Sequence, residues 1–354
     1  MEPALFRRWP ALRGRIHHHP LLGAPTPVEP LALKGAPDGA LLVKHDERSC
    51  SLYGGNKPRK LEFVLGHALA HRCRRLVTTG GIGTHHGLAT TILGRSAGLE
   101  TTLVLVDQPL TDAVRRSLLL MEAWGAELIF GRDVKGTALH VSRVLARGAV
   151  RGERPYLVAT GGSSTRGNFG FVSAALELSE QVAEGRLPEP AEIWVAVGTG
   201  GTLGGLAAGV RLAGLSSRVV GVLVTDILPP SRRSLARTAT RAAGSLRRVA
   251  RELPEVRVTP DEIELVTDQL GPGYGAPTPE AREAVASAEE AGLRLETTYT
   301  GKCFAALRAR AEAGRLETGP VLFWNTYNAV DVEASAPRPL DPQRLPPPLQ
   351  RRLG

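Results

Sequence analysis

Residues 192–205 have the sequence EIWVAVGTGGTLGG, in which a continuous apolar run passes directly into a glycine-rich segment. The apolar run predicts a strand that is buried on both faces. The glycines predict a tight turn, and a helix follows at about 203–213. Backbone N–H groups of such a turn, together with the N-terminus of the next helix, attract an anion. The candidate ligands of that anion are Gly198, Thr199, Gly200, Gly201 and Thr202.

This glycine-rich segment differs from the two common nucleotide-binding motifs. No Lys-Ser/Thr pair closes it as in a Walker loop. Its glycine spacing also fits the dinucleotide fingerprint poorly. A phosphate monoester is therefore the anion that suits it best.

Strand-like and helix-like segments alternate on both sides of this motif. The further predicted strands are 75–79, 101–106, 127–130, 219–224 and 321–324. The further predicted helices are 60–72, 110–125, 231–252, 279–292 and 302–314. Because the connections are too long for hairpins, the sequence predicts an α/β fold whose parallel sheets are covered by helices.

The composition is that of a globular protein of about two domains: 354 residues, 42% hydrophobic and 22% charged. The net charge of +9 is mostly arginine, and we interpret it as a solvated surface, since no nucleic-acid-binding motif accompanies it. The three cysteines form no C-x-x-C pair, which predicts neither a disulfide framework nor a zinc site. With no signal peptide or membrane span in evidence, we expect a cytoplasmic protein that binds neither nucleic acid nor membrane.

A second motif, YGGNKPRKLE at residues 53–62, places a lysine at the start of a predicted helix. The two glycines allow the backbone to approach a ligand closely, Asn56 can cap the helix, and Pro58 suits its first turn. Lys57 would lie at the positive end of the helix dipole and beside two further basic residues, so we expect a lowered ammonium pKa. A lysine with more free amine at neutral pH is suited to forming a Schiff base.

A third motif, TGGIGTHHG at residues 79–87, is another glycine-rich loop between a strand and a helix. Its backbone N–H groups, Thr84 and one of the histidines His85 and His86 can hold a substrate carboxylate. The alternative is that Thr84 only caps the helix. Two adjacent histidines point to different faces of a helix and make a poor metal pair, so no metal is predicted.

An imine-forming lysine, a phosphate site and a second anion site together describe a pyridoxal-phosphate (PLP) site for an amino acid. The segments that carry this description are GGNKPRKLEF, TTGGIGTHHGLAT, TGGSSTRGNFGFVSAALEL, VAVGTGGTLGGL and YTGK. Their order and spacing resemble the D-cysteine desulfhydrase and 1-aminocyclopropane-1-carboxylate (ACC) deaminase family, which consists of fold-type II PLP enzymes. The resemblance runs from about residue 22 to 330.

The resemblance implies a tryptophan synthase β-like fold with two parallel-sheet, three-layer α/β domains and PLP between them. The large PLP-binding domain would comprise residues 1–59 and 171–354, and the small inserted domain residues 60–170. The family also implies a homodimer. The Pro/Arg-rich stretch 336–354 predicts an extended tail.

The resemblance also implies roles for individual residues. Lys57 would form the imine with the cofactor. The other residues implied in cofactor binding are Asn56, His85, Gly198, Thr199, Gly200, Gly201, Thr202, Thr300 and Thr326. The residues implied in substrate binding are Thr84, His85 and His86, and those implied in catalysis are Lys57, Thr84, Tyr274 and Tyr299. The chain departs from the family at His85, which replaces an asparagine, and at Tyr327 and Asn328, which replace two glycines.

The expected reaction is α,β-elimination from a small amino acid such as D-cysteine, giving a keto acid and ammonia. Thr300 and Thr326 match the desulfhydrases, whereas deaminases carry glutamate and leucine at these positions. A neutral hydroxyl at the pyridine nitrogen suits loss of a good leaving group better than ring opening. The alternatives are PLP-dependent β-replacement or another specialised amino-acid reaction, and a non-catalytic PLP-binding protein.

Overall fold

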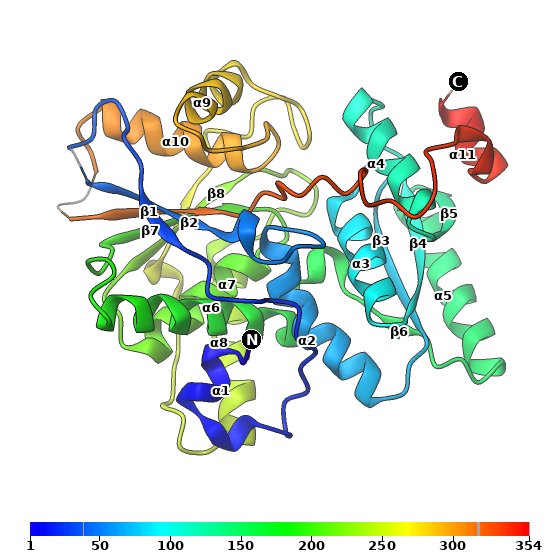
Figure 1. Cartoon of the computed structure of the whole chain (residues 1–354), viewed down its shortest axis with the longest axis horizontal. Coiled ribbons are helices and arrows are strands. Elements are labelled where there is room, and N and C mark those ends of the chain that lie inside the picture. Colours follow the sequence, from blue (N-terminus) through cyan, green and yellow to red (C-terminus); the bar gives the residue numbers. More distant parts are fainter. Residues whose placement is uncertain (38, 317–318, 354) are drawn as a thin grey trace.

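The computed structural model describes residues 1–37, 39–316 and 319–353, and its strands form two separate sheets (Figure 1). The larger sheet has six strands in the order β1-β2-β10-β7-β8-β9. Their bounds are Val28–Pro30 (β1), Leu41–His45 (β2), Val321–Asn325 (β10), Glu192–Val197 (β7), Arg218–Leu223 (β8) and Ile263–Val266 (β9). All neighbouring pairs are parallel except β1 with β2.

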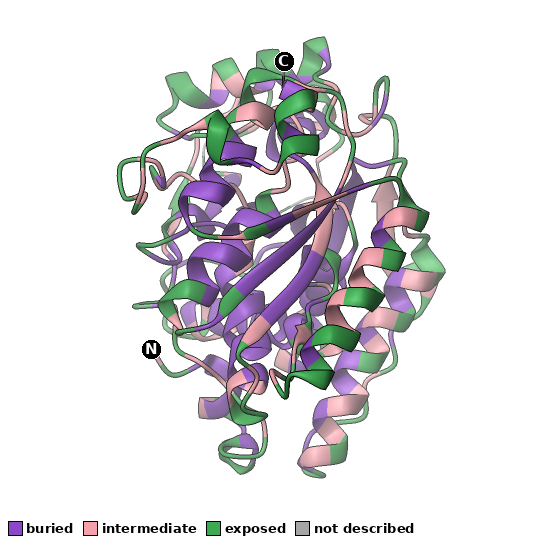
Figure 2. Cartoon of the chain, turned by 90° about the vertical axis from the view of Figure 1, so that its right-hand side faces the viewer, coloured by how far each residue is buried: buried purple, intermediate pink, exposed green. Residues whose placement is uncertain are grey.

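The smaller sheet has four parallel strands in the order β5-β4-β3-β6. They are Glu127–Arg132 (β5), Glu100–Val106 (β4), Arg75–Gly81 (β3) and Tyr156–Leu157 (β6). In Figure 2 the strands of this sheet are mostly buried between helices. Long apolar strands with helices on both sides are what parallel sheets require, and the prediction of an α/β fold with parallel sheets is confirmed.

Helices cover both faces of the larger sheet (Figure 1). One apolar cluster packs against α1 (Ala4–Arg8), α6 (Thr165–Ala183), α7 (Gly201–Ala213) and α8 (Arg232–Val249). A second cluster packs the opposite face against α9 (Pro279–Glu290) and α10 (Thr300–Glu312). The Arg-rich α8 buries only leucines and alanines, as its sequence predicts, and none of its arginines is buried.

The smaller sheet has a third cluster, to which α2 (Asn56–Ala70), α3 (His85–Ser96) and α4 (Asp112–Ala123) contribute. The remaining long helix is α5 (Val134–Val150). Short helical turns are η1 (Pro10–Leu12), η2 (Asp46–Arg48), η3 (Thr160–Gly162), η4 (Pro260–Glu262) and η5 (Pro342–Arg344). Among the described helices, none combines the length and the apolar character needed to cross a bilayer. The division into two domains expected from the sequence, with its boundaries, stays a prediction.

The C-terminal segment corrects the prediction of an extended tail. Its described residues form η5 and a last helix, α11 (Pro347–Leu353), beside the smaller sheet (Figure 1). Leu345, Leu349 and Leu353 are buried in the cluster of that sheet. The prolines misled the prediction, because Pro347 occupies the first position of a helix, where its missing N–H costs nothing.

Leu349 tests this packing, since its side chain has no exposed surface. We expect Leu349→Ala to lower the free energy of unfolding by about 2–4 kcal/mol, because it leaves a cavity in the cluster. Urea unfolding followed by circular dichroism measures the change. The control is Arg351→Ala on the exposed side of the same helix, which should change little. Equal stability of both variants and the unchanged protein would contradict the packing.

Candidate active site

The glycine-rich segment after β7 forms the strand–turn–helix junction expected from its sequence. Gly200 takes a left-handed conformation, with φ of 83°, and α7 begins at Gly201. A Cβ atom on Gly201 would lie 2.4 Å from the hydroxyl oxygen of Ser163. Glycine is therefore required at both positions, at one for its backbone conformation and at the other for space.

Two threonines connect this junction to neighbouring segments. The hydroxyl oxygens of Thr199 and Ser163 lie 2.6 Å apart. Thr202 Oγ1 accepts a hydrogen bond of 3.2 Å from Nδ2 of Asn56, at the start of α2. The turn, the start of α6 and the start of α2 thus meet at one point.

Lys57 follows Asn56 in the first turn of α2, and its Nζ donates to Asn56 Oδ1 over 2.9 Å. Burial lowers the pKa of this ammonium to about 8, although the carboxylate of Glu296 opposes the shift. The lowered pKa agrees with the sequence prediction, but burial is its main cause. Arg59, two residues after Lys57, forms ion pairs with a different set of partners.

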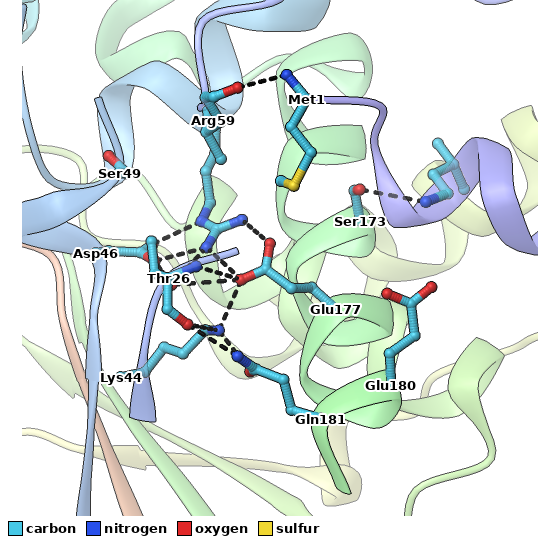
Figure 3. Close-up of polar contacts among 12 residues, drawn as sticks. Met1, Thr26, Lys44, Asp46, Ser49, Arg59, Ser173, Glu177, Glu180 and Gln181 are labelled. Atoms are coloured by element: carbon cyan, nitrogen blue, oxygen red, sulfur yellow. Dashed lines mark hydrogen bonds and ion pairs between the residues drawn. The ribbon is translucent and has the colours of Figure 1, made fainter. Parts of the chain in front are cut away.

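Those partners form a buried ion network, shown in Figure 3. The guanidinium of Arg59 donates to Asp46 over 2.8 and 2.9 Å and to Glu177 over 3.0 Å. Lys44 Nζ also contacts Glu177, at 2.7 Å. Glu177 has its pKa lowered to about 2: burial alone would raise it, but Arg59 and Lys44 outweigh the burial. The network holds the first turn of α2 against α6 and β2.

Lys60, one turn after Lys57, is a site residue that the sequence prediction missed. Its side chain is buried, and its Nζ donates to the carbonyl of Gly161 at 3.2 Å and to Ser163 Oγ at 3.3 Å. No carboxylate of the described residues forms an ion pair with it. Burial, and then the charge of Lys57, lower its ammonium pKa well below the usual value. A buried amine with only neutral partners, linked through Ser163 to Thr199, suits a phosphate group, whose negative charge would favour the protonated form of the lysine.

Tyr274 and Tyr299 form a hydrogen-bonded pair with their hydroxyl oxygens 2.5 Å apart. A Cβ atom on Gly198 would lie 3.3 Å from the ring of Tyr299, which places this ring beside the glycine-rich turn. Burial raises the pKa of both hydroxyls. Both tyrosines therefore stay protonated at neutral pH and can donate protons.

Glu296 is a second residue that the sequence prediction missed. Its carboxylate accepts the backbone N–H groups of Thr298, Tyr299 and Thr300 over 2.7, 2.8 and 2.9 Å. The hydroxyl of Thr300 is buried and lies 3.3 Å from the same carboxylate. A glutamate just before a helix, where orphan N–H groups need acceptors, was the signal available in the sequence.

In the third motif, Thr84 and His85 belong to the candidate site, whereas His86 is buried in the core of the smaller sheet. Thr84 caps α3 by accepting the Gly87 N–H at 3.2 Å, and its own hydroxyl proton stays available for donation. His85 keeps solvent-accessible surface, but desolvation by the surrounding protein lowers its pKa, which Glu296 opposes. His86 is buried, with Nε2 3.0 Å from the hydroxyl of Thr78.

The departure at Tyr327 and Asn328 has a visible structural effect. Asn328 Oδ1 accepts the backbone N–H of Gly54 over 2.6 Å, next to the lysine-bearing turn. The carbonyl of Thr326 accepts the N–H of Asn56 at 3.3 Å. The segment after β10 thereby fixes the backbone from Gly54 to Asn56. The contact to Gly54 uses the side chain of Asn328, and the glycine expected from the family at this position would not form it.

The structure therefore links most of the predicted site residues. Hydrogen bonds connect Lys57 with Asn56, Asn56 with Thr202 and Thr326, and Tyr274 with Tyr299. The charge of Lys57 also lowers the pKa of both His85 and His86. His86 differs from the others because its ring already has hydroxyl partners inside the smaller sheet, which does not favour its predicted contact with substrate.

Comparison with known proteins gives consistent results. The sequence model of the family described as pyridoxal-phosphate dependent enzyme matches residues 20–326. A D-cysteine desulfhydrase from Klebsiella pneumoniae (strain 342) is 32% identical over 325 residues, which cover 90% of this chain and 95% of the relative. The crystal structure of an ACC deaminase homologue matches with a TM-score of 0.75 at 27% identity, covering 93% of this chain and 96% of the other. A threonine deaminase isoform 2 from Solanum lycopersicum shares the fold, with a TM-score of 0.60, 13% identity and coverage of 92% and 85%.

The contact between Asn328 and Gly54 can be tested without any ligand. We expect Asn328→Ala to speed hydrogen exchange of the Gly54 amide by roughly five- to tenfold, the factor given by a hydrogen bond of about 1 to 1.5 kcal/mol. Hydrogen exchange followed by NMR measures it. Asn328→Asp keeps an acceptor oxygen and should preserve the slow exchange. Equally fast exchange in both variants would show that the side-chain oxygen is not the acceptor.

Proposed function

This chain belongs to the family of pyridoxal-phosphate dependent enzymes that includes the D-cysteine desulfhydrases and ACC deaminases, and from that premise we propose that it eliminates sulfide from D-cysteine. The products would be sulfide, pyruvate and ammonia. The observation that carries the proposal is Lys57, a half-buried lysine whose pKa of about 8 suits it to exchange a proton near neutral pH. The D-cysteine desulfhydrase relative supports the choice of substrate.

The residues at the strand–helix junction fit the cofactor. Its phosphate group would be held by the backbone N–H groups of Gly198 to Thr202, by the hydroxyl of Thr199 and by Lys60, whose hydrogen-bond partners are all neutral. Lys57 would bind the aldehyde carbon. When bound, PLP supplies an electron sink that stabilises the negative charge left on the substrate Cα after a proton is removed.

Lys57 is the group we assign to that proton transfer. With a pKa of about 8, roughly one lysine in ten is neutral at pH 7, whereas an ordinary lysine is almost entirely charged. Asn56 Oδ1 receives one Nζ–H and so orients the amine.

The tyrosine pair is the proton donor that we assign to the leaving sulfur. Because burial raises both hydroxyl pKa values, neither tyrosine ionises at neutral pH. Tyr299 can pass its proton to the sulfur and receive one from Tyr274 over their 2.5 Å contact, and Tyr274, which is partly exposed, takes a proton from solvent in turn. Glu296 holds the backbone at Tyr299 and so fixes the position of its ring.

Thr84 and His85 are the residues we assign to the substrate carboxylate. The hydroxyl of Thr84 accepts the Gly87 N–H with a lone pair, so its proton can point to a carboxylate oxygen. The N-terminus of α3 adds the positive end of a helix dipole. His85 stays neutral at pH 7 with its lowered pKa and can still donate one N–H.

We also propose that the protein is a homodimer, as the resemblance to its family implies, and that it is cytoplasmic. The net charge of +9 does not alter this proposal, since nothing else in the sequence indicates a nucleic-acid or membrane partner.

The function is tested by supplying PLP-loaded protein with D-cysteine. We expect sulfide, pyruvate and ammonia in equal amounts, and no product from Lys57→Arg, because arginine keeps the charge but cannot serve as the proton acceptor. L-Cysteine and ACC serve as comparison substrates. A folded, PLP-loaded protein that releases no sulfide from D-cysteine would overturn the assignment of substrate.

The pKa of Lys57 makes a separate prediction for cofactor binding. Only the neutral amine attacks the aldehyde, so the rate of PLP attachment should rise by about tenfold per pH unit below pH 8 and level off above it. Stopped-flow absorbance of PLP-free protein mixed with PLP measures the rate. A rate that keeps rising up to about pH 10, the ordinary lysine value, would contradict the lowered pKa.

A further inference from the structure

A cavity of about 410 Å³ lies between the N-terminal segment, α2, α6 and α8. Four arginines line it: Arg15, Arg166, Arg241 and Arg248. The side chains of Phe63 and Phe169, both buried, form part of its wall. None of the residues assigned above to the cofactor or the substrate lines this cavity, so it is a separate site.

The charge of this cavity is uncompensated. No aspartate or glutamate lines it. Among residues 1–37, 39–316 and 319–353, none of the four guanidiniums forms an ion pair; Arg15 donates to the carbonyl of Val249 and Arg248 to the hydroxyl of Ser245. Another cavity, beside α1 and α6, is different, because Glu180 and Glu184 pair there with Arg7 and Arg186.

The geometry of α8 and α6 concentrates these charges. Arg241, Ser245 and Arg248 are spaced by four and three residues and so lie on one face of α8. Arg166 is the second residue of α6, where the positive end of the dipole of a 19-residue helix adds to its charge. Nδ1 of His67, which also lines the cavity, is buried and has no hydrogen-bond partner.

From this arrangement we propose that the cavity binds a small metabolite through its phosphate group. Planar guanidiniums match phosphate oxygens in pairs, and four of them without acids are suited to a dianion. Phe63 and Phe169 are buried and form the closed base of the cavity, so the guanidiniums are its accessible binding groups. The volume is within the range of small-molecule sites.

The site lies on the two helices that build the catalytic centre. Phe63 follows Lys60 by one turn of α2, and Arg166 follows the segment of Ser163 at the start of α6. A bound phosphate therefore contacts the outer side of the same helices whose inner sides hold the cofactor residues. Binding at this cavity does not depend on the proposed reaction, so the two proposals can fail separately.

The test is calorimetric titration of the PLP-loaded protein with adenosine monophosphate, with inorganic phosphate and with adenosine. PLP already occupies the catalytic phosphate site in this preparation. We expect saturable binding of adenosine monophosphate and weaker binding of inorganic phosphate, while adenosine does not bind. No binding of either phosphate-bearing probe at millimolar concentration would overturn the proposal.

Two double variants locate the binding. Arg241→Glu with Arg248→Glu should weaken adenosine monophosphate by at least about tenfold, because two phosphate contacts become repulsive. The matched control is Arg233→Glu with Arg237→Glu on the same helix, exposed residues that do not line the cavity, with the same change of net charge. The control should bind within about twofold of the unchanged protein. Equal weakening in both would attribute the binding to overall charge and overturn the proposal.

Discussion

The guanidinium of Arg59, enclosed between Asp46 and Glu177, is the contact on which the active site depends. Two cations and two carboxylates meet here without solvent, so their charges balance within the network. Removing such ions from water costs several kcal/mol each, and only complete pairing offsets that cost. The indole N–H of Trp324 also donates to Asp46, over 2.7 Å. The start of α2 is thereby fixed two residues after Lys57, from β2, α6 and β10 at once.

The three lysines near this network illustrate how surroundings decide chemistry. Lys44 has Glu177 and two further oxygens as partners, and it serves structure. Lys60 is equally buried but has only neutral partners, so its charge is left for an anionic ligand. Lys57 has a single amide oxygen, and burial makes its neutral form accessible near physiological pH. The three side chains are chemically identical, so their different roles come from the groups that surround each of them.

The pattern of strands and helices could be predicted from the sequence because apolar runs and glycine-rich turns are local signals. The turn at Gly200 followed from the same kind of signal, whereas the N-cap of α2 is Gly55 and not Asn56. The packing of Leu349 and the contact of Asn328 with Gly54 could not be predicted, because each joins residues that are distant in the sequence. The domain boundaries and the roles of the individual site residues rest on the resemblance to the family.

The route of the chain between its two sheets determines where the residues of the candidate site lie. The backbone passes from one sheet to the other three times, through residues 46–74, 158–191 and 326–353. Lys57, Ser163 and Asn328 each lie on one of these connections. These three residues of the candidate site therefore lie on the connections themselves and not inside either sheet. Any change in the position of one sheet relative to the other would alter the distances between these residues.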